Sequence, residues 1–239
     1  MDSTTTIRDI VADDFRAAAV FQKHGIDFCC GGNQPIADAC QEKGIDDQVV
    51  LGELEAALTP GGEVPRFKTW ELDFLADYIV ANHHVYVRGA IETIGAHTRR
   101  VAEVHGQHHP EVVAIAERFA EVADEMTRHM FKEERMLFPY ISGLAAAART
   151  GSPLAAAPFG TAANPIRMME AEHESAGAAM VEIRRLSGNY APPDDACTTY
   201  RVSYQELEAF EADLHRHVHL ENNILFPKAL RLEAELLNR

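Results

Sequence analysis

One phrase occurs twice in this chain of 239 residues. It reads histidine, three residues, glutamate, three residues and Leu-Phe-Pro; the first copy holds His129 and Glu133, the second His217 and Glu221. On an α-helix, positions i and i+4 lie on one face, a turn apart. Each copy can therefore direct an imidazole and a carboxylate at one point, and two facing helices could supply four metal ligands.

Both copies lie inside apolar stripes with the spacing of helices that pack in a bundle. The stripes are Phe119, Val122, Met126, His129, Glu133, Leu137, Tyr140 and Leu207, Phe210, Leu214, His217, Glu221, Leu225. A solvated polar pair does not belong on such a face, and buried imidazoles and carboxylates are costly unless they are paired or bound to metal. The two matching copies therefore favour a metal site.

The remaining sequence predicts an all-α protein whose main part is an up-down four-helix bundle. Bundle helices are expected at about 70–100, from 111 onward, from 164 to about 187 and at about 195–237, with an irregular connection at 143–163. The pair Asn164-Pro165 is typical of an N-cap followed by the first helical residue.

Residues 1–62 are expected to form a small helical domain, and residues 63–239 the bundle. The small domain should contain a helix over 7–21 and two more at about 35–43 and 47–58. Between the first two lies Cys29-Cys30-Gly31-Gly32, whose composition is typical of a tight turn. The Pro- and Gly-rich segment 59–65 predicts the linker.

Composition and charge narrow the classes of function. The formal net charge of −15 disfavours nucleic acid or an anionic membrane as a partner. There is no apolar run of about 18 residues, and the first residues lack the basic and apolar regions of a signal peptide. Four irregularly spaced cysteines do not suggest a disulfide framework. We therefore expect a cytoplasmic protein with no membrane partner.

Histidines on the other two bundle helices complete the candidate site. His173 lies on the apolar face of the third helix, and either His83 or His84 could face inward from the first. At about 1.5 Å per residue, counting from the loops places them within a turn or two of His129 and His217. One layer near the middle of the bundle can therefore hold all of these side chains.

Other histidines are expected outside this layer. His105, His108 and His109 occupy a loop too far along the helix to join it, and His219 faces away because it lies two residues past His217. A lone histidine on an apolar face is usually a satisfied core residue. The structural alternative is therefore a bundle whose His and Glu side chains merely pair with one another.

Four imidazoles and two carboxylates are too many ligands for a tetrahedral zinc site. They suit two iron ions with two imidazoles each, with Glu133 and Glu221 as bridges and with room for an oxo or hydroxo bridge and a small exogenous ligand. Manganese prefers more oxygen ligands. Ferritin-like di-iron bundles use a majority of carboxylates, so a ferroxidase is disfavoured.

Motifs over nearly the whole chain form one pattern: Phe28-Cys29-Cys30-Gly31-Gly32, His129-Met-x-Lys-Glu133-Glu, Met169-Glu-x-Glu-His173-x-x-Ala-Gly177, Ala196-Cys-Thr-Thr199 and His217-x3-Glu221-Asn-Asn-x-Leu-Phe-Pro227. This pattern resembles hemerythrin-like domains, and more closely the repair-of-iron-centres family of the YtfE/ScdA type. The family's first-helix pattern, a ligand histidine with an arginine four residues on, falls on His84 and Arg88 and selects His84. Cys40 matches no family pattern, and Cys197 is interpreted as structural.

The resemblance implies a cytoplasmic non-haem di-iron protein, expected to be a homodimer, that restores iron–sulfur clusters damaged by nitric oxide or peroxide. Its partners would be damaged iron–sulfur proteins, and its small ligands NO or O2. It would release or transfer iron, or reduce NO, with Cys29 and Cys30 as thiols that exchange electrons or contact an iron centre. The alternative is a hemerythrin-like sensor or carrier of O2 or NO without turnover.

Overall fold

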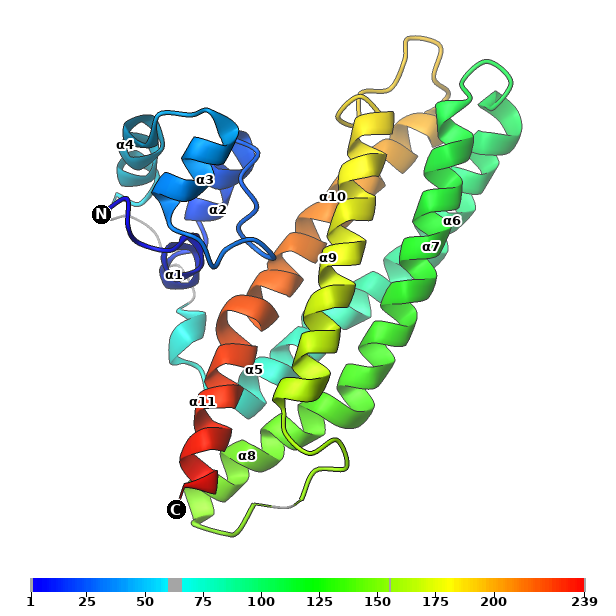
Figure 1. The fold of residues 1–239 in the computed structure, drawn as a ribbon. Coiled ribbons are helices and arrows are strands. Elements are labelled where there is room, and N and C mark those ends of the chain that lie inside the picture. The colour runs from blue at the N-terminus through cyan, green and yellow to red at the C-terminus, as the bar shows by residue number, and fades with distance from the viewer. Residues whose placement is uncertain (1, 60–65, 155, 239) are drawn as a thin grey trace.

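The computed structural model describes residues 2–59, 66–154 and 156–238, and its regular elements over these ranges are helices. A group of short N-terminal helices lies beside a bundle of long ones, as Figure 1 shows. The predicted all-α class is therefore confirmed. The expected domain boundary at 62–63 falls within 60–65, outside the described residues. In the part of the chain that the structure describes, no helix is long and apolar enough to cross a membrane.

The N-terminal group consists of α1 (Ile7–Asp13), α2 (Ala17–Lys23), α3 (Ile36–Lys43) and α4 (Asp47–Ala57). The single helix expected over 7–21 is wrong, because the chain breaks at Asp14, which has an extended backbone with φ −151°. The Asp14 carboxylate accepts a hydrogen bond from the backbone N–H of Arg16 at 3.0 Å. Such local side-chain bonds compete with the helical ladder and end it.

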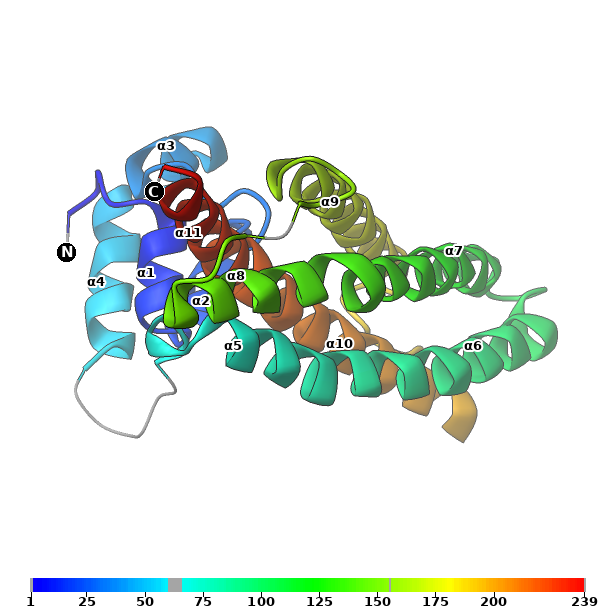
Figure 2. The same ribbon diagram turned by 90° about the horizontal axis from the view of Figure 1, so that it is seen from below.

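The bundle is preceded by the short helix η1 (Phe67–Thr69). Its elements are α5 (Leu72–Ile79), η2 (Val80–His84), α6 (Val85–His105), α7 (Glu111–Lys132), η3 (Glu133–Leu137), α8 (Phe138–Thr150), α9 (Ala163–Leu186), α10 (Thr198–Leu220), η4 (Glu221–Leu225) and α11 (Phe226–Leu237). Helix α6 packs beside α7, α7 beside α9, and α10 beside both α9 and α6. This closed ring is the expected four-helix bundle (Figures 1 and 2).

Two predicted details around the second loop of the bundle are wrong. Helix α8 continues to Thr150, so residues 143–150 are not irregular; Leu144 is buried, and the alanines around it are strong helix formers. Gly151, with φ 69°, then ends the helix. Helix α9 begins at Ala163, so Asn164 lies inside it, and the Asn164 side chain instead donates to the carbonyl of Phe159 at 2.8 Å.

Within residues 66–154 and 156–238, three π-helical turns interrupt the bundle helices: η2, η3 and η4. In such a turn the N–H of residue i+5 donates to the carbonyl of residue i, as Phe138 does to Glu133. After the end of η3 and of η4 there is one phenylalanine and then a proline, Pro139 or Pro227. In a regular helix the proline ring would clash with the carbonyl four residues back. The repeated Leu-Phe-Pro ending therefore marks a widened turn directly after each glutamate.

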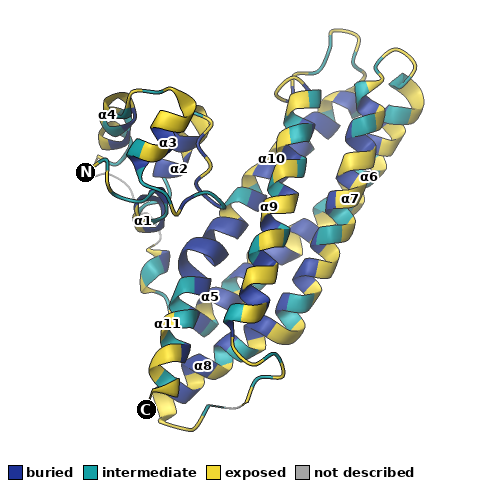
Figure 3. Cartoon of the chain, in the orientation of Figure 1, coloured by how far each residue is buried: buried dark blue, intermediate teal, exposed yellow. Residues whose placement is uncertain are grey.

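Two apolar clusters fill the molecule, and a polar layer separates them inside the bundle. The first cluster joins the N-terminal helices to one half of the bundle and includes Met130, Met180 and Leu214. The second fills the other half and includes Leu137 and Met169. Figure 3 shows the buried faces turned inward along the whole bundle. The histidines and glutamates of interest are buried, and along each helix they lie close to the point where residues of the first cluster give way to residues of the second.

Candidate metal centre

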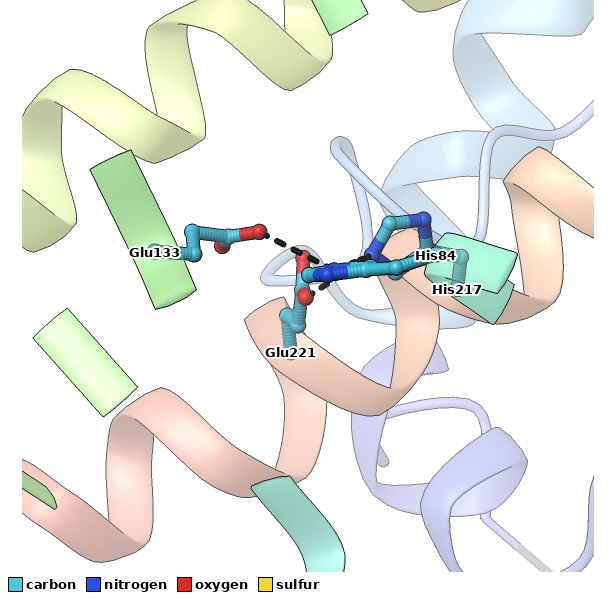
Figure 4. A group of neighbouring side chains, drawn as sticks. All are labelled: His84, Glu133, His217 and Glu221. Atoms are coloured by element: carbon cyan, nitrogen blue, oxygen red, sulfur yellow. Dashed lines mark hydrogen bonds and ion pairs between the residues drawn. The ribbon is translucent and has the colours of Figure 1, made fainter. Parts of the chain in front are cut away.

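The structure brings all six predicted residues of the bundle into one buried layer. His84, Glu133, His217 and Glu221 form one group, and His129, Glu133, His173 and Glu221 form a second. Within each group the ligand atoms lie within 4.8 Å of one another, and both glutamates belong to both groups. Figure 4 shows the first group, with its side chains converging from three separate helices.

Each carboxylate reaches one histidine of each group. The Oε2 atom of Glu133 lies 3.3 Å from His84 Nε2 and 3.2 Å from His129 Nε2. Glu221 places Oε1 at 2.9 Å from His217 Nε2 and Oε2 at 3.0 Å from His173 Nε2. Each carboxylate is therefore placed where two neighbouring cation sites could share it.

The π turn η2 decides which histidine of the first helix faces the centre. A regular helix continuing the stripe through Ile79 would turn His83 inward. The extra residue of the π turn shifts the phase by about 100°, so His84 faces inward instead. His83 remains beside the site, with Nδ1 at 2.9 Å from Asp213 and its ring stacked 5.6 Å from that of His217.

Partners behind the imidazoles fix three of the four rings. The Nδ1–H groups of His84 and His129 donate to Glu134 at 2.7 Å and to Glu172 at 2.9 Å. His173 Nδ1–H donates to Asn222 Oδ1 at 2.9 Å. Because a carboxylate only accepts, the neutral rings of His84 and His129 carry their proton on Nδ1, and their Nε2 lone pairs face the centre. The neutral ring of His173 does the same where the amide oxygen of Asn222 is its acceptor.

The donor set fits a pair of cations. His84 Nε2 and His217 Nε2 are 3.2 Å apart, and His129 Nε2 and His173 Nε2 are 3.0 Å apart. Within the described residues, Glu133 Oε1 has no hydrogen-bond partner. Neutral imidazoles and carboxylates present only lone pairs to this space, so protons or cations must hold it together. Four nitrogens and two shared carboxylates suit a di-iron centre.

The electrostatics of the layer favour bound cations. Burial raises the pKa of Glu133 and Glu221, but the surrounding imidazoles outweigh burial and leave both below the ordinary range. Burial lowers the pKa of His129, yet Glu133 and Glu172 raise it to about 10. In the metal-free chain the His129 ring therefore carries a second proton at neutral pH and is positively charged, and a metal ion must displace that proton. Metal binding accordingly weakens as the pH falls.

Residues expected outside the site lie outside it. His105 and His109 lie near the loop between α6 and α7, where His105 Nε2 is 3.2 Å from the exposed thiol of Cys197. Cys197 occupies the N-cap position of α10 without a capping hydrogen bond from its side chain, and it is exposed rather than part of the core. His219 is buried against the N-terminal helices, with its ring centroid 5.1 Å from that of Phe15.

The cysteine pair forms a second cluster, separate from the layer. We call residues 27–32 the cysteine loop. The Asp27 carboxylate accepts from the backbone N–H groups of Cys29, Cys30 and Gly31 at 2.9, 3.0 and 3.0 Å. The two free thiols are 3.9 Å apart. The neighbouring thiol and burial raise the pKa of Cys29 well above its usual value, so this group stays protonated at neutral pH.

Sequence reasoning missed the roles of Glu134, Glu172 and Asn222, the outer partners that accept hydrogen bonds from Nδ1 of the candidate ligand histidines. Each adjoins a predicted ligand in sequence, and Asn222 directly follows Glu221 in the repeated phrase. Adjacency to a predicted ligand is the sequence signal by which these residues could have been found. It does not show that Glu134 and Glu172 serve histidines on other helices, because side-chain reach across the bundle is set by packing.

Replacing Glu134 with glutamine is expected to weaken metal binding by about tenfold, because His84 then donates to a neutral amide and becomes a poorer ligand. Arg88, which pairs with Glu134, also loses its carboxylate. Competition with a chelator of known affinity measures the change. Glu121→Gln, an exposed substitution on α7 with no contact to the centre, serves as the control. Equal affinities in the two variants would contradict the assigned role of Glu134.

The bundle and its histidine–glutamate layer define a hemerythrin-like cation-binding protein. Residues 75–229 match the family described as "Hemerythrin HHE cation binding domain". Residues 3–58 match ScdA_N, described as a domain of unknown function (DUF542). The two matches lie on either side of the undescribed residues 60–65.

Comparison with curated proteins makes the assignment more specific. "Iron-sulfur cluster repair protein YtfE" of Yersinia pestis (strain Pestoides F) is 34% identical over 219 residues, covering 91% of this chain and 93% of the relative. The protein of the same name from Yersinia pseudotuberculosis serotype O:1b (strain IP 31758) gives the same values. The chain belongs to the repair-of-iron-centres family of the YtfE/ScdA type, which confirms the resemblance predicted from its motifs.

Proposed function

We propose that this chain is a non-haem di-iron protein of the cytoplasm that repairs iron–sulfur clusters damaged by nitric oxide or by oxidants. The observation that carries the proposal is the sharing of two buried carboxylates between two pairs of histidines. The names of the relatives supply the reaction class. Damaged iron–sulfur proteins are the proposed partners, and a homodimer is the proposed assembly.

In this proposal His84 and His217 would hold one ion and His129 and His173 the other, with Glu133 and Glu221 shared by both sites. When bound, the irons supply ferrous–ferric redox chemistry and a position for a small ligand such as NO or O2. The outer partners keep Nδ1 protonated, so that each ring offers its Nε2 lone pair. The apolar clusters on either side keep bulk water out of the layer.

The cysteine loop is proposed to act on the client. Cys30 is the more exposed of the two thiols, and Cys29 is buried beneath it. A cavity of about 420 Å³ opens beside the pair, lined among others by Glu174, Arg184 and His215. Free thiols suit a reducing cytoplasm, where they can exchange electrons or contact an iron centre of the partner.

A repair assay tests this function. Iron-loaded protein is incubated anaerobically, with a thiol reductant, with a [4Fe–4S] enzyme inactivated by nitric oxide. We expect the wild type to restore activity and Cys29→Ser/Cys30→Ser to restore it at least about tenfold more slowly while keeping its iron, because a serine hydroxyl cannot replace a thiol in electron exchange or in contact with an iron centre. Cys197→Ser, at the far end of the bundle, is the matched control and should behave as wild type.

The same assay separates repair from simple carriage. A hemerythrin-like carrier or sensor would bind O2 or NO reversibly, restore no client activity and show no dependence on the cysteine pair. That result in the wild type would overturn the repair proposal. The packing of a thiol-bearing domain against the metal-site helix supports repair, since a carrier has no use for the thiols.

A further inference from the structure

One amide side chain contacts both functional features of the molecule. Asn222 is buried in η4 and directly follows the proposed bridge Glu221. Its Oδ1 accepts from His173 Nδ1 at 2.9 Å. Its Nδ2 donates to the backbone carbonyl of Cys29 at 3.3 Å. A proposed metal ligand and the cysteine loop are thus joined through one residue, across 193 positions of sequence.

The orientation of this amide is determined by its partners. A backbone carbonyl only accepts hydrogen bonds, so Nδ2 must face Cys29 and Oδ1 must face His173. This orientation holds only while His173 keeps its proton on Nδ1. A ring that carries its proton on Nε2 presents an acceptor to Asn222, and the amide then satisfies either the ring or the cysteine loop, but not both.

We propose that Asn222 is a positioning residue that couples the cysteine loop to the metal centre. This inference rests on the proposed occupancy of the site by metal. A metal ion on His173 Nε2 excludes the proton from that atom and keeps it on Nδ1. The amide is then held with Nδ2 toward Cys29, and the loop stays closed. Without metal the second tautomer becomes accessible, and the bond to the loop is lost in part of the population.

The neighbouring Asn223 provides a natural comparison. Its Nδ2 donates to the carbonyl of Phe28 at 2.9 Å, and its Oδ1 accepts from Arg8 Nε at 3.1 Å. It therefore fastens the same loop by the same kind of bond. The ring that it contacts is His219, which lies outside both groups of proposed ligands. Asn223 should hold the loop equally well with and without metal.

Alkylation of the cysteine pair measures opening of the loop, because Cys29 is buried and reacts only when the loop opens. Rates are measured with iodoacetamide on the full chain, metal-free and after anaerobic loading with ferrous iron, by mass spectrometry of the peptide. One hydrogen bond predicts that loading slows the reaction of Cys29 in the wild type by about fivefold. The exposed Cys197 is an internal reference whose rate should not change.

Two matched substitutions identify the residue responsible. Asn222→Asp keeps an acceptor opposite His173, as Glu134 and Glu172 provide for other rings of this site, and replaces the donor to Cys29 with an oxygen that cannot bond its carbonyl. We expect it to bind two irons and to show the same alkylation rate with and without them. Asn223→Asp removes the donor to Phe28 and should react faster in both states, with the wild-type ratio between them preserved.

A reciprocal measurement supports the test, because coupling between two sites acts equally in both directions. Alkylating the cysteine pair should weaken iron binding about fivefold in the wild type, since one hydrogen bond is lost, and leave it unchanged in Asn222→Asp. Iron-dependent protection that persists in Asn222→Asp would overturn the coupling and indicate direct binding of iron by the thiols. If the wild type binds two irons and Cys29 gains no protection, the coupling is overturned and the proposed function is not. Failure to bind two metal ions would overturn both this coupling and the proposed function.

Discussion

Replacing Glu133 with alanine is expected to abolish the paired metal centre. Its Oε2 lies within 3.3 Å of one histidine from each group, so the residue belongs to both proposed ion sites. Without it, the two sites share only Glu221, and each loses an ionised ligand in a fully buried position. Iron retained after anaerobic loading and desalting should fall from two to less than one ion per chain, and the Mössbauer signal of a coupled pair should disappear.

Glu125→Ala is the matched control for this substitution. Glu125 lies on α7 two turns before Glu133 and bonds Ser175 at the surface. It should retain two coupled irons, which would show that the loss is specific to the buried carboxylate. Circular dichroism of both variants checks that the helices persist. A coupled di-iron signal in Glu133→Ala would contradict the assignment of Glu133 as a bridge.

Removing the metal is expected to lower the melting temperature by about 10 °C. A ligand at a thousand times its dissociation constant stabilises the folded state by about 4 kcal/mol, and each kcal/mol shifts the melting temperature of a chain of this size by about 2–4 °C. The physical reason lies in the layer itself, where lone pairs of four imidazoles and two carboxylates converge between apolar clusters. Protons must replace the cations, and they neutralise less charge.

Differential scanning calorimetry of iron-loaded and chelator-treated protein measures this shift. The Glu133→Ala variant supplies the control, because a chain that cannot hold the pair should melt at nearly the same temperature with and without iron. Equal melting temperatures for the loaded and metal-free wild type, in samples shown to contain two irons, would indicate that the layer is satisfied by its own hydrogen bonds.

The sequence predicted the bundle and the ligand layer because both depend on local periodicity. The phrase that contains His129 and Glu133 fixes their common face without reference to the rest of the fold. Its recurrence at His217 predicted that a second helix would meet the first. His173 could be added because its apolar neighbours follow the same spacing, and the structure brings all of these residues together.

What the sequence could not predict depends on departures from regular geometry. The spacing of apolar residues left the choice between His83 and His84 open, because no proline marks the π turn η2 that decides it; His84 was selected by the resemblance to the family. The break at Asp14 comes from one side chain that accepts a hydrogen bond from the backbone N–H two residues further on, at Arg16. The contact of Asn222 with Cys29 joins parts of the chain that no local pattern relates. Local rules thus describe helices well and contacts between distant segments poorly.

The most direct test of the account is crystallography of the iron-loaded chain, with anomalous scattering recorded on both sides of the iron absorption edge. We predict two iron peaks per chain, one beside His84 and His217 and the other beside His129 and His173, with Glu133 and Glu221 reaching both. A single peak, no peak in the bundle, or iron bound only by Asp27, Cys29 and Cys30 would contradict it.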